Sequence, residues 1–211
     1  MVRVAVLVSG GGTNLQAIID ARAAGKIPHG EIALVVSSRG DAFALERANV
    51  AGIPALVAKK EKGVPPNAYG ELLLDILREN RIDFVVLAGF ITILPENVIW
   101  AYENRIINVH PSLIPSFCGA GYYGLKVHEA ALAYGVKVTG ATVHYVNEIP
   151  DGGKIIAQKA VDVLPCDTPE TLQKRVMVEA EWVLLPRAVE DCCREILLAR
   201  ECCRGNKSPS S

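Results

Sequence analysis

Apolar runs and amphipathic segments alternate along the first two-thirds of the chain. Short runs rich in branched aliphatic residues predict strands that are buried on both faces, at residues 4–8, 32–36, 55–58, 84–88 and 106–109. Apolar residues at helical spacing predict amphipathic helices between them, at residues 15–24, 43–51 and 69–80. The predicted buried face of the third helix carries Leu72, Leu73, Ile76 and Leu77. This order of strands and helices predicts a parallel sheet with right-handed crossovers and helices on both faces.

The final third of the chain follows a different pattern. Residues 138–146 and 155–163 are rich in β-branched residues and flank the turn sequence Ile149-Pro150-Asp151-Gly152-Gly153, so we expect two strands that run antiparallel to each other. The whole pattern predicts the α/β class, with an open, mostly parallel twisted sheet flanked by helices (Rossmann-like) and antiparallel strands in the C-terminal half. Neither a repeat nor a linker interrupts the chain. We therefore expect a single domain over residues 1–203, made of an N-terminal half (about 1–105) and a C-terminal half (about 106–203).

The C-terminal part of this domain is expected to be helical. A long helix starts at about Pro169 in this prediction, with Asp167 or Thr168 as its N-cap and Pro186 as a kink or an interruption. The segment after Glu190 is compatible with either a helix or a last strand. Residues 204–211 are polar and rich in small residues, and we expect them to form a disordered tail.

Composition sets limits on partners and compartment. Half of the 211 residues are hydrophobic, 21% are charged and the formal net charge is -1, so the chain lacks the positive field usual in nucleic-acid binding. No apolar stretch approaches the ~20 residues of a membrane span. The first apolar run is followed by Ser9-Gly10-Gly11-Gly12 instead of a signal cleavage site. We expect a cytoplasmic protein without nucleic-acid or membrane partners, either a monomer or a homodimer.

Cysteine spacing argues for free thiols. The six cysteines include two adjacent pairs, at 192–193 and 202–203, and none of them forms a C-x-x-C or Cys/His zinc pattern. An α/β pattern without a signal peptide favours the reduced state. A redox or metal role for the adjacent pairs stays open, although no spacing supports it, and we predict no metal site.

A glycine-rich sequence, Ser9-Gly10-Gly11-Gly12-Thr13-Asn14, follows the first predicted strand and begins the first helix. Glycines allow a ligand to approach the backbone closely, and the free N–H groups of a helix N-terminus favour a phosphate. The alternative is a tight strand-to-helix turn in which Thr13 or Asn14 caps the helix. If the loop binds phosphate, we expect Gly12→Val to weaken that binding because a branched side chain blocks the approach.

The fifth predicted strand ends in Asn108-Val109-His110-Pro111-Ser112. In open α/β sheets, ligands bind at the carboxyl ends of the strands. Asn108 and His110 are two residues apart and therefore point to the same side of a strand. An amide beside an imidazole suits a reaction that develops negative charge on an oxygen. The alternative is a core histidine with its hydrogen bonds satisfied.

Asp151 lies in the turn between the two C-terminal strands, where aspartate is also common for purely structural reasons. If this turn folds back beside His110, the carboxylate would raise the pKa of the imidazole and hold it protonated. A fourth segment, residues 89–95, is apolar and follows the fourth strand. It suits the wall of a pocket for a flat heteroaromatic ring or, equally, a part of the core.

These segments, in this order, resemble the folate-dependent glycinamide ribonucleotide transformylase family from about Arg3 to Glu190. The resemblance rests on SGGGTNLQ at 9–16, VLAGF at 86–90, NVHPSLIPS at 108–116, GYYGLKVHEA at 121–130, VTGATVH at 138–144, DGG at 151–153, DTPE at 167–170 and EAEW at 179–182. It implies the formyltransferase fold, with a nucleotide-binding N-terminal half and a folate-binding, catalytic C-terminal half. The implied reaction transfers a formyl group from 10-formyltetrahydrofolate, as a co-substrate, to the amine of glycinamide ribonucleotide.

The resemblance also implies residue roles. Asn108, His110 and Asp151 would be catalytic: the first two bind and polarise the formyl oxygen, and Asp151 keeps His110 charged. The residues implied to bind the ribonucleotide are Gly11, Gly12, Thr13, Asn14, Gly89, Pro111 and Glu181. The residues implied to bind the folate are Ile91, Thr92, Ile93, Leu94, Asn108, Asn147, Glu148, Ile149, Pro150 and Asp151. By the same resemblance we expect a cis peptide bond before Pro115.

Several positions depart from this family, and none of them belongs to the catalytic trio. Thr92 stands where several relatives carry arginine, and Lys154 where proline is common. A basic residue usual before the third helix is replaced at 65–67, with Lys59, Lys60 or Lys62 as substitutes. The usual Gly-Arg-Leu turn is missing after Glu190.

Two alternative functions remain. Other formyl-transfer enzymes share this core, but methionyl-tRNA formyltransferase carries a further domain after it and formyltetrahydrofolate hydrolase one before it, and we expect room for neither in 211 residues. A non-catalytic nucleotide-binding module would use the glycine loop alone. It would have no use for Asn108, His110 and Asp151.

Overall fold

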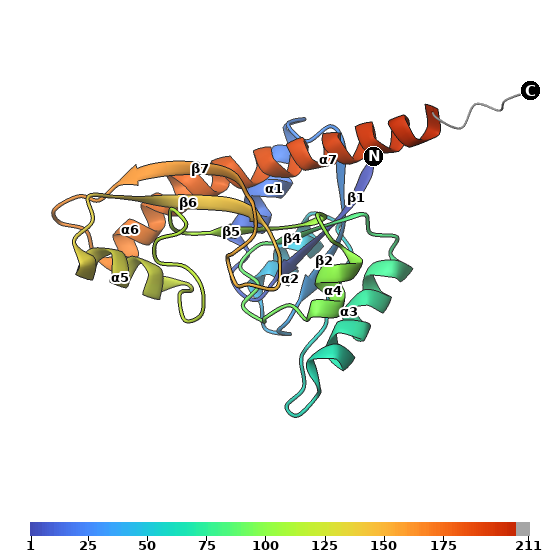
Figure 1. Cartoon of the computed structure of the whole chain (residues 1–211), viewed down its shortest axis with the longest axis horizontal. Coiled ribbons are helices and arrows are strands. Elements are labelled where there is room, and N and C mark those ends of the chain that lie inside the picture. Colours follow the sequence, from blue (N-terminus) through green and yellow to red (C-terminus); the bar gives the residue numbers. More distant parts are fainter. Residues whose placement is uncertain (206–211) are drawn as a thin grey trace, which may run out of the picture.

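The computed structural model describes residues 1–205, and its strands form one seven-stranded sheet (Figure 1). They are β1 (Val2–Val8), β2 (Gly30–Ser37), β3 (Ala55–Val57), β4 (Phe84–Leu87), β5 (Ile106–His110), β6 (Val138–Tyr145) and β7 (Ile155–Asp162). Their order in the sheet is β3-β2-β1-β4-β5-β6-β7. The first five strands are parallel, whereas β6 is antiparallel to β5 and β7 is antiparallel to β6. The predicted fold class is therefore confirmed.

Helices cover both faces of the sheet (Figure 1). The helices that share a hydrophobic core with one face are α1 (Thr13–Ala23), α2 (Phe43–Val50), α6 (Pro169–Val176) and α7 (Trp182–Gly205). The opposite face packs against α3 (Pro66–Glu79) and α4 (Glu96–Ala101). Helix α5 (Leu125–Tyr134) lies beside α6. Within residues 1–205, no helix combines the length and the apolar character needed to cross a membrane.

Strand β1 shows why the apolar runs predict buried strands. Val4 and Val6 belong to the core under α1 and α7, and Ala5 and Leu7 belong to the core under α3 and α4. Successive side chains of a strand point to opposite faces, so a strand between two helical layers is apolar at every position. The prediction fails at β3, where Val57 is 49% exposed, because this strand lies at the edge of the sheet.

The helices differ from their predicted form in two ways. On α3, Leu72 is exposed, and the buried face instead comprises Tyr69, Gly70, Leu73, Leu74 and Leu77. The long C-terminal helix is interrupted at a π-helical turn, η1 (Met177–Glu181), which precedes Pro186. Pro186 itself is accommodated inside α7, in the second turn of that helix, where its missing N–H leaves only one bond unmade.

Of the two predicted N-cap residues, Asp167 and Thr168, the N-cap of α6 is Thr168. Its side chain accepts a hydrogen bond from the Thr171 amide and forms a capping box with Thr171. The segment after Glu190 is helical up to Gly205, which settles the choice between helix and strand for the described residues. The tail predicted for residues 204–211 lies outside the described residues except at its first two positions, which belong to α7.

Candidate active site

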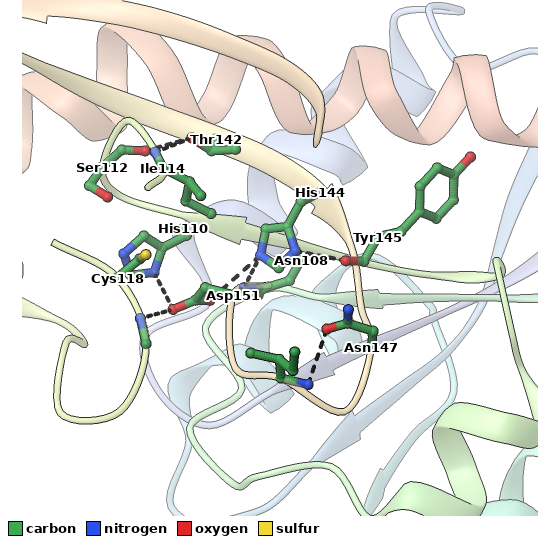
Figure 2. A network of polar contacts seen from close by, with 12 residues as sticks. Asn108, His110, Ser112, Ile114, Cys118, Thr142, His144, Tyr145, Asn147 and Asp151 are labelled. Atoms are coloured by element: carbon green, nitrogen blue, oxygen red, sulfur yellow. Dashed lines mark hydrogen bonds and ion pairs between the residues drawn. The ribbon is translucent and has the colours of Figure 1, made fainter. Parts of the chain in front are cut away.

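The three predicted catalytic side chains come together at the carboxyl end of β5 (Figure 2). Asn108 and His110 lie on this strand, and Asp151 lies in the turn between β6 and β7 with a left-handed φ of 56°. The Nδ1 atom of His110 is 3.4 Å from Oδ2 of Asp151, and the Asn108 amide donates to Oδ1 of Asp151 at 3.4 Å. The turn therefore folds back onto β5, as the sequence analysis required.

The loop after β5 holds this arrangement through its backbone. The Nε2 atom of His110 lies 2.8 Å from the Phe117 carbonyl oxygen, and the Gly119 amide donates to Oδ2 of Asp151 at 2.8 Å. A carbonyl oxygen only accepts, so Nε2 carries the imidazole proton and Nδ1 faces the Asp151 carboxylate. The bond before Pro115, at the start of this loop, is cis, as predicted.

His144 is a further member of the site, and the sequence analysis did not single it out. Strand β6 pairs with β5 so that His144 stands directly opposite Asn108. Its Nδ1 donates to the Tyr145 carbonyl at 2.8 Å, which leaves Nε2 to accept from the Asn108 amide at 3.2 Å. The same Nε2 lies 3.5 Å from Asp151. The signal in the sequence was the alternation of polar residues, Thr142 and His144, within a predicted strand.

Two opposing effects act on the pKa of His110. Burial lowers the pKa of His110, and this effect outweighs the Asp151 carboxylate and the Phe117 carbonyl, which raise it. Burial also raises the pKa of Asp151, but its contacts with His144, His110 and the Gly119 amide lower that pKa overall. Asp151 thus acts on the pKa of His110 in the predicted direction, while burial opposes it. That Asp151 keeps His110 charged during the reaction stays a prediction.

A cavity of about 160 Å³ lies beside Asn108 and Asp151. All ten residues implied to bind the folate line it, together with Leu87, Phe90, Ile99, His144 and Val146. Glu148, which lines the cavity, accepts a hydrogen bond from Nε1 of Trp100 at 2.7 Å, and this bond links α4 to the loop that carries Asp151. A larger cavity of about 720 Å³ lies between α1 and α7, but no residue of the trio lines it.

The glycine loop lies at the same edge of the sheet, because β1, β4 and β5 are neighbours. Gly12 is the N-cap of α1, in the left-handed conformation with φ 70°, and no side chain caps this helix. The alternative role of Thr13 or Asn14 as a cap is therefore wrong. Asn14 instead donates to Glu181 of η1 at 2.6 Å. Burial raises the pKa of Glu181, although this hydrogen bond lowers it.

The remaining predicted ribonucleotide-binding residues, Gly89 and Pro111, lie in the segments that follow β4 and β5. Gly89 lies two residues after β4, which neighbours β1, and Pro111 directly follows β5, which neighbours β4. The cysteines at 118, 166, 192, 193 and 202 are free thiols, and Cys203 lies outside the described side chains. In the part of the chain that the structure describes, no three His, Cys, Asp or Glu side chains are grouped to hold a metal ion.

The fold and the site define a class of enzyme: the chain belongs to the formyl transferase family, which matches residues 2–189. Within this class, relatives of the chain include phosphoribosylglycinamide formyltransferases. The chloroplastic one of Arabidopsis thaliana is 42% identical over 200 residues, which cover 94% of this chain and 68% of that protein. The one of Haemophilus influenzae is 38% identical over 190 residues, with 90% and 86% covered.

A solved structure gives the same result. Glycinamide ribonucleotide transformylase 1 from Symbiobacterium toebii superposes with a TM-score of 0.86 at 42% identity, covering 92% of this chain and 89% of that one. The resemblance inferred from the sequence is thus confirmed. The family is one of enzymes, and the relatives named here are phosphoribosylglycinamide formyltransferases.

Proposed function

We propose that this chain transfers the formyl group of 10-formyltetrahydrofolate to the amine of glycinamide ribonucleotide, giving formylglycinamide ribonucleotide and tetrahydrofolate in de novo purine biosynthesis. The observation that carries the proposal is the meeting of Asn108, His110 and Asp151 beside the cavity lined by the ten folate residues. The cytoplasmic location and the monomeric or dimeric state expected from the sequence stay part of the proposal.

The folate is proposed to occupy the cavity of about 160 Å³. The apolar segment 91–94 on one side and the turn 147–151 on the other form walls suited to a flat ring. Asn108 and Asp151 line this cavity, so a formyl group at its inner end would meet an amide donor and a carboxylate.

The ribonucleotide is proposed to place its phosphate on the glycine loop. The amides of residues 11–14 lie at the start of α1, where the helix dipole favours an anion. Glu181, bonded to Asn14 behind this loop, is the proposed partner of the sugar. Gly89 and Pro111 would flank the path from the phosphate to the trio, because they follow β4 and β5.

In the proposed chemistry, the amine nitrogen attacks the formyl carbon and the carbonyl electron pair moves to oxygen. One Asn108 amide hydrogen turns from its 3.4 Å contact with Asp151 to the oxyanion and stabilises it. Negative charge favours the imidazolium form, so His110 takes up the proton that the attacking nitrogen loses, relayed by the ionised Asp151. Collapse of the intermediate re-forms the carbonyl and breaks the bond to N10 of the folate. N10 receives the proton, so no covalent enzyme intermediate is needed.

The test is an assay of the purified protein with both substrates, following loss of 10-formyltetrahydrofolate. We expect consumption only when glycinamide ribonucleotide is present, and roughly 100-fold slower turnover for Asn108→Ala because an oxyanion donor is lost. Methionyl-tRNA in place of the ribonucleotide serves as the alternative acceptor. Formylation of methionyl-tRNA, with glycinamide ribonucleotide left unchanged, would contradict the proposal.

A further inference from the structure

The glycine loop, residues 9–14, packs closely against the first turns of α2. The Ala44 amide donates to the Gly10 carbonyl at 3.1 Å, and Nε of Arg47 donates to the Gly11 carbonyl at 2.8 Å. A Cβ atom added at Gly12 would lie 2.6 Å from Cβ of Ala44, so no space separates the loop from the helix. Helix α2 therefore fixes the carbonyl side of the loop.

The fixed carbonyls determine where the loop amides point. In a trans peptide unit, the N–H points opposite to the C=O. Because the carbonyls of Gly10 and Gly11 face α2, the amides of Gly11 and Gly12 face away from it. Neither amide makes a backbone hydrogen bond within residues 1–205. Together with the left-handed Gly12, this arrangement makes a concave set of donors suited to an anion.

The Arg47 guanidinium is held at this position by contacts with α1 and with a neighbouring side chain of α2. Its Nη1 donates to Gln16 of α1 at 3.0 Å, and its central carbon lies 5.1 Å from the centre of the Phe43 ring. No carboxylate of the described residues forms an ion pair with it. The Arg47 guanidinium thus connects α2, the glycine loop and α1, on the side of the loop opposite to the one that the Gly11 and Gly12 amides face.

We propose that Arg47 is a positioning residue of a phosphate monoester subsite: it holds the Gly11 carbonyl so that the loop amides face the phosphate, and it adds a positive field from behind. The proposal rests on the proposed function in identifying that phosphate as part of glycinamide ribonucleotide. The recognition of the anion is independent of that identity.

Matched variants separate this role from a structural one. A merely structural Arg47 would stabilise α2 by stacking on Phe43, without changing anion affinity. Arg47→Ala removes both the charge and the contact with Gly11, whereas Arg47→Lys keeps the charge but loses the planar fork that reaches two acceptors. Arg39→Ala is the control, because Arg39 is exposed, pairs with Asp41 at 2.7 Å and carries the same charge.

The experiment measures KM for each substrate, kcat and the inhibition constant of inorganic phosphate against the ribonucleotide. For Arg47→Ala we expect the ribonucleotide KM and the phosphate constant to rise about tenfold or more, as for a lost charge-assisted contact. In Arg47→Ala, the folate KM and kcat should stay within about twofold of wild type. In Arg39→Ala, the ribonucleotide KM and the phosphate inhibition constant should not change. Equal rises in both KM values, or an Arg47→Ala protein that matches Arg39→Ala, would overturn the proposal.

A direct titration with inorganic phosphate keeps this test separate from the proposed reaction. A wild-type protein that leaves glycinamide ribonucleotide unchanged, yet binds phosphate about tenfold more tightly than Arg47→Ala does, would contradict the proposed function and support the role of Arg47. If Arg47→Ala does not fold, Arg47→Lys decides: we expect its phosphate affinity to fall about threefold. An affinity equal to that of wild type overturns the proposal.

Discussion

The glycine loop and the catalytic trio achieve their geometry in opposite ways. The loop is six consecutive residues whose working groups are backbone amides, positioned by contacts with α2. The trio consists of side chains from β5 and from a turn about 40 residues further along, and backbone groups of a third segment, at Phe117 and Gly119, hold it in place. A site made of consecutive residues, such as the loop, can be recognised in the sequence. For a site assembled from distant segments, such as the trio, the sequence shows only the separate residues.

The two regions also differ in their electrostatics. The loop contacts Arg47, for which residues 1–205 provide no ion-pair partner, and its amide donors cannot titrate. In the trio, His110 is buried (4% exposed) and Asn108 and Asp151 are half-buried, so the charges of His110 and Asp151 depend on the balance between burial and neighbouring groups. Changes in the loop should therefore act through packing and binding, and changes in the trio through protonation and rate.

The largest effect expected in the loop region is on stability. Gly12→Val places a branched side chain at φ 70° and against Ala44, which should lower the free energy of unfolding by about 3 kcal/mol or more. This replaces the expectation from the sequence, that valine at Gly12 acts by blocking the ligand. Thermal unfolding checks it.

Gly11→Ala is the matched control, because an added Cβ there meets no atom within 4 Å. It should fold normally and raise the ribonucleotide KM about tenfold, since the methyl group stands where the phosphate approaches. Similar unfolding temperatures for the two variants would show that α2 does not confine the loop.

In the trio, Asp151→Asn should lower kcat by roughly two orders of magnitude, the scale of a lost acid-base contribution. It should also lower the pKa of His110 further, because the carboxylate that opposes the effect of burial is gone. Single-turnover kinetics and an NMR titration of His110 measure the two effects. Near-normal turnover with an unmoved titration would refute the proton relay.

The smallest effect concerns His128 on α5, which is fully buried near the trio. Burial, and then the charge of His110, lower the pKa of His128 to about 4, against an unfolded value of about 6.5. The unfolded chain then binds a proton that the folded chain does not. The contribution of His128 to the free energy of unfolding is therefore present above about pH 6.5 and is lost as the pH falls towards 4.

From pH 7 to pH 6, this linkage lowers the free energy of unfolding by about 0.7 kcal/mol. Urea unfolding at the two pH values measures it, and His128→Leu should remove this part of the difference. A His128→Leu protein that keeps the whole wild-type difference would show that His128 is not the group responsible.

Periodicity predicted most strands and helices correctly, because β1 and its neighbours lie between two helical layers that demand apolar residues at every position. It failed at Val57 and Leu72, whose exposure depends on which strand is outermost and how α3 rotates. These are properties of the assembled sheet, not of a local sequence.

The candidate site was predictable to a similar extent. The resemblance to the family predicted that Asp151 lies beside His110, which the spacing of the two residues alone could not predict. The effect of the Asp151 carboxylate on the pKa of His110 was foreseen, but the opposing effect of burial was not, because burial arises only when several segments of the chain pack together. His144 and Arg47 were missed because strand register and helix docking, not motifs, place them in their regions.

The most direct test of the account is a structure of the protein with glycinamide ribonucleotide and a formyl-folate analogue that cannot transfer its formyl group. We predict the phosphate on the amides of residues 11–14, and the formyl oxygen within about 3 Å of the Asn108 amide nitrogen, the distance of a hydrogen bond. A folate outside the cavity beside Asp151, or a formyl oxygen that contacts neither Asn108 nor His110, would contradict the proposed catalytic site.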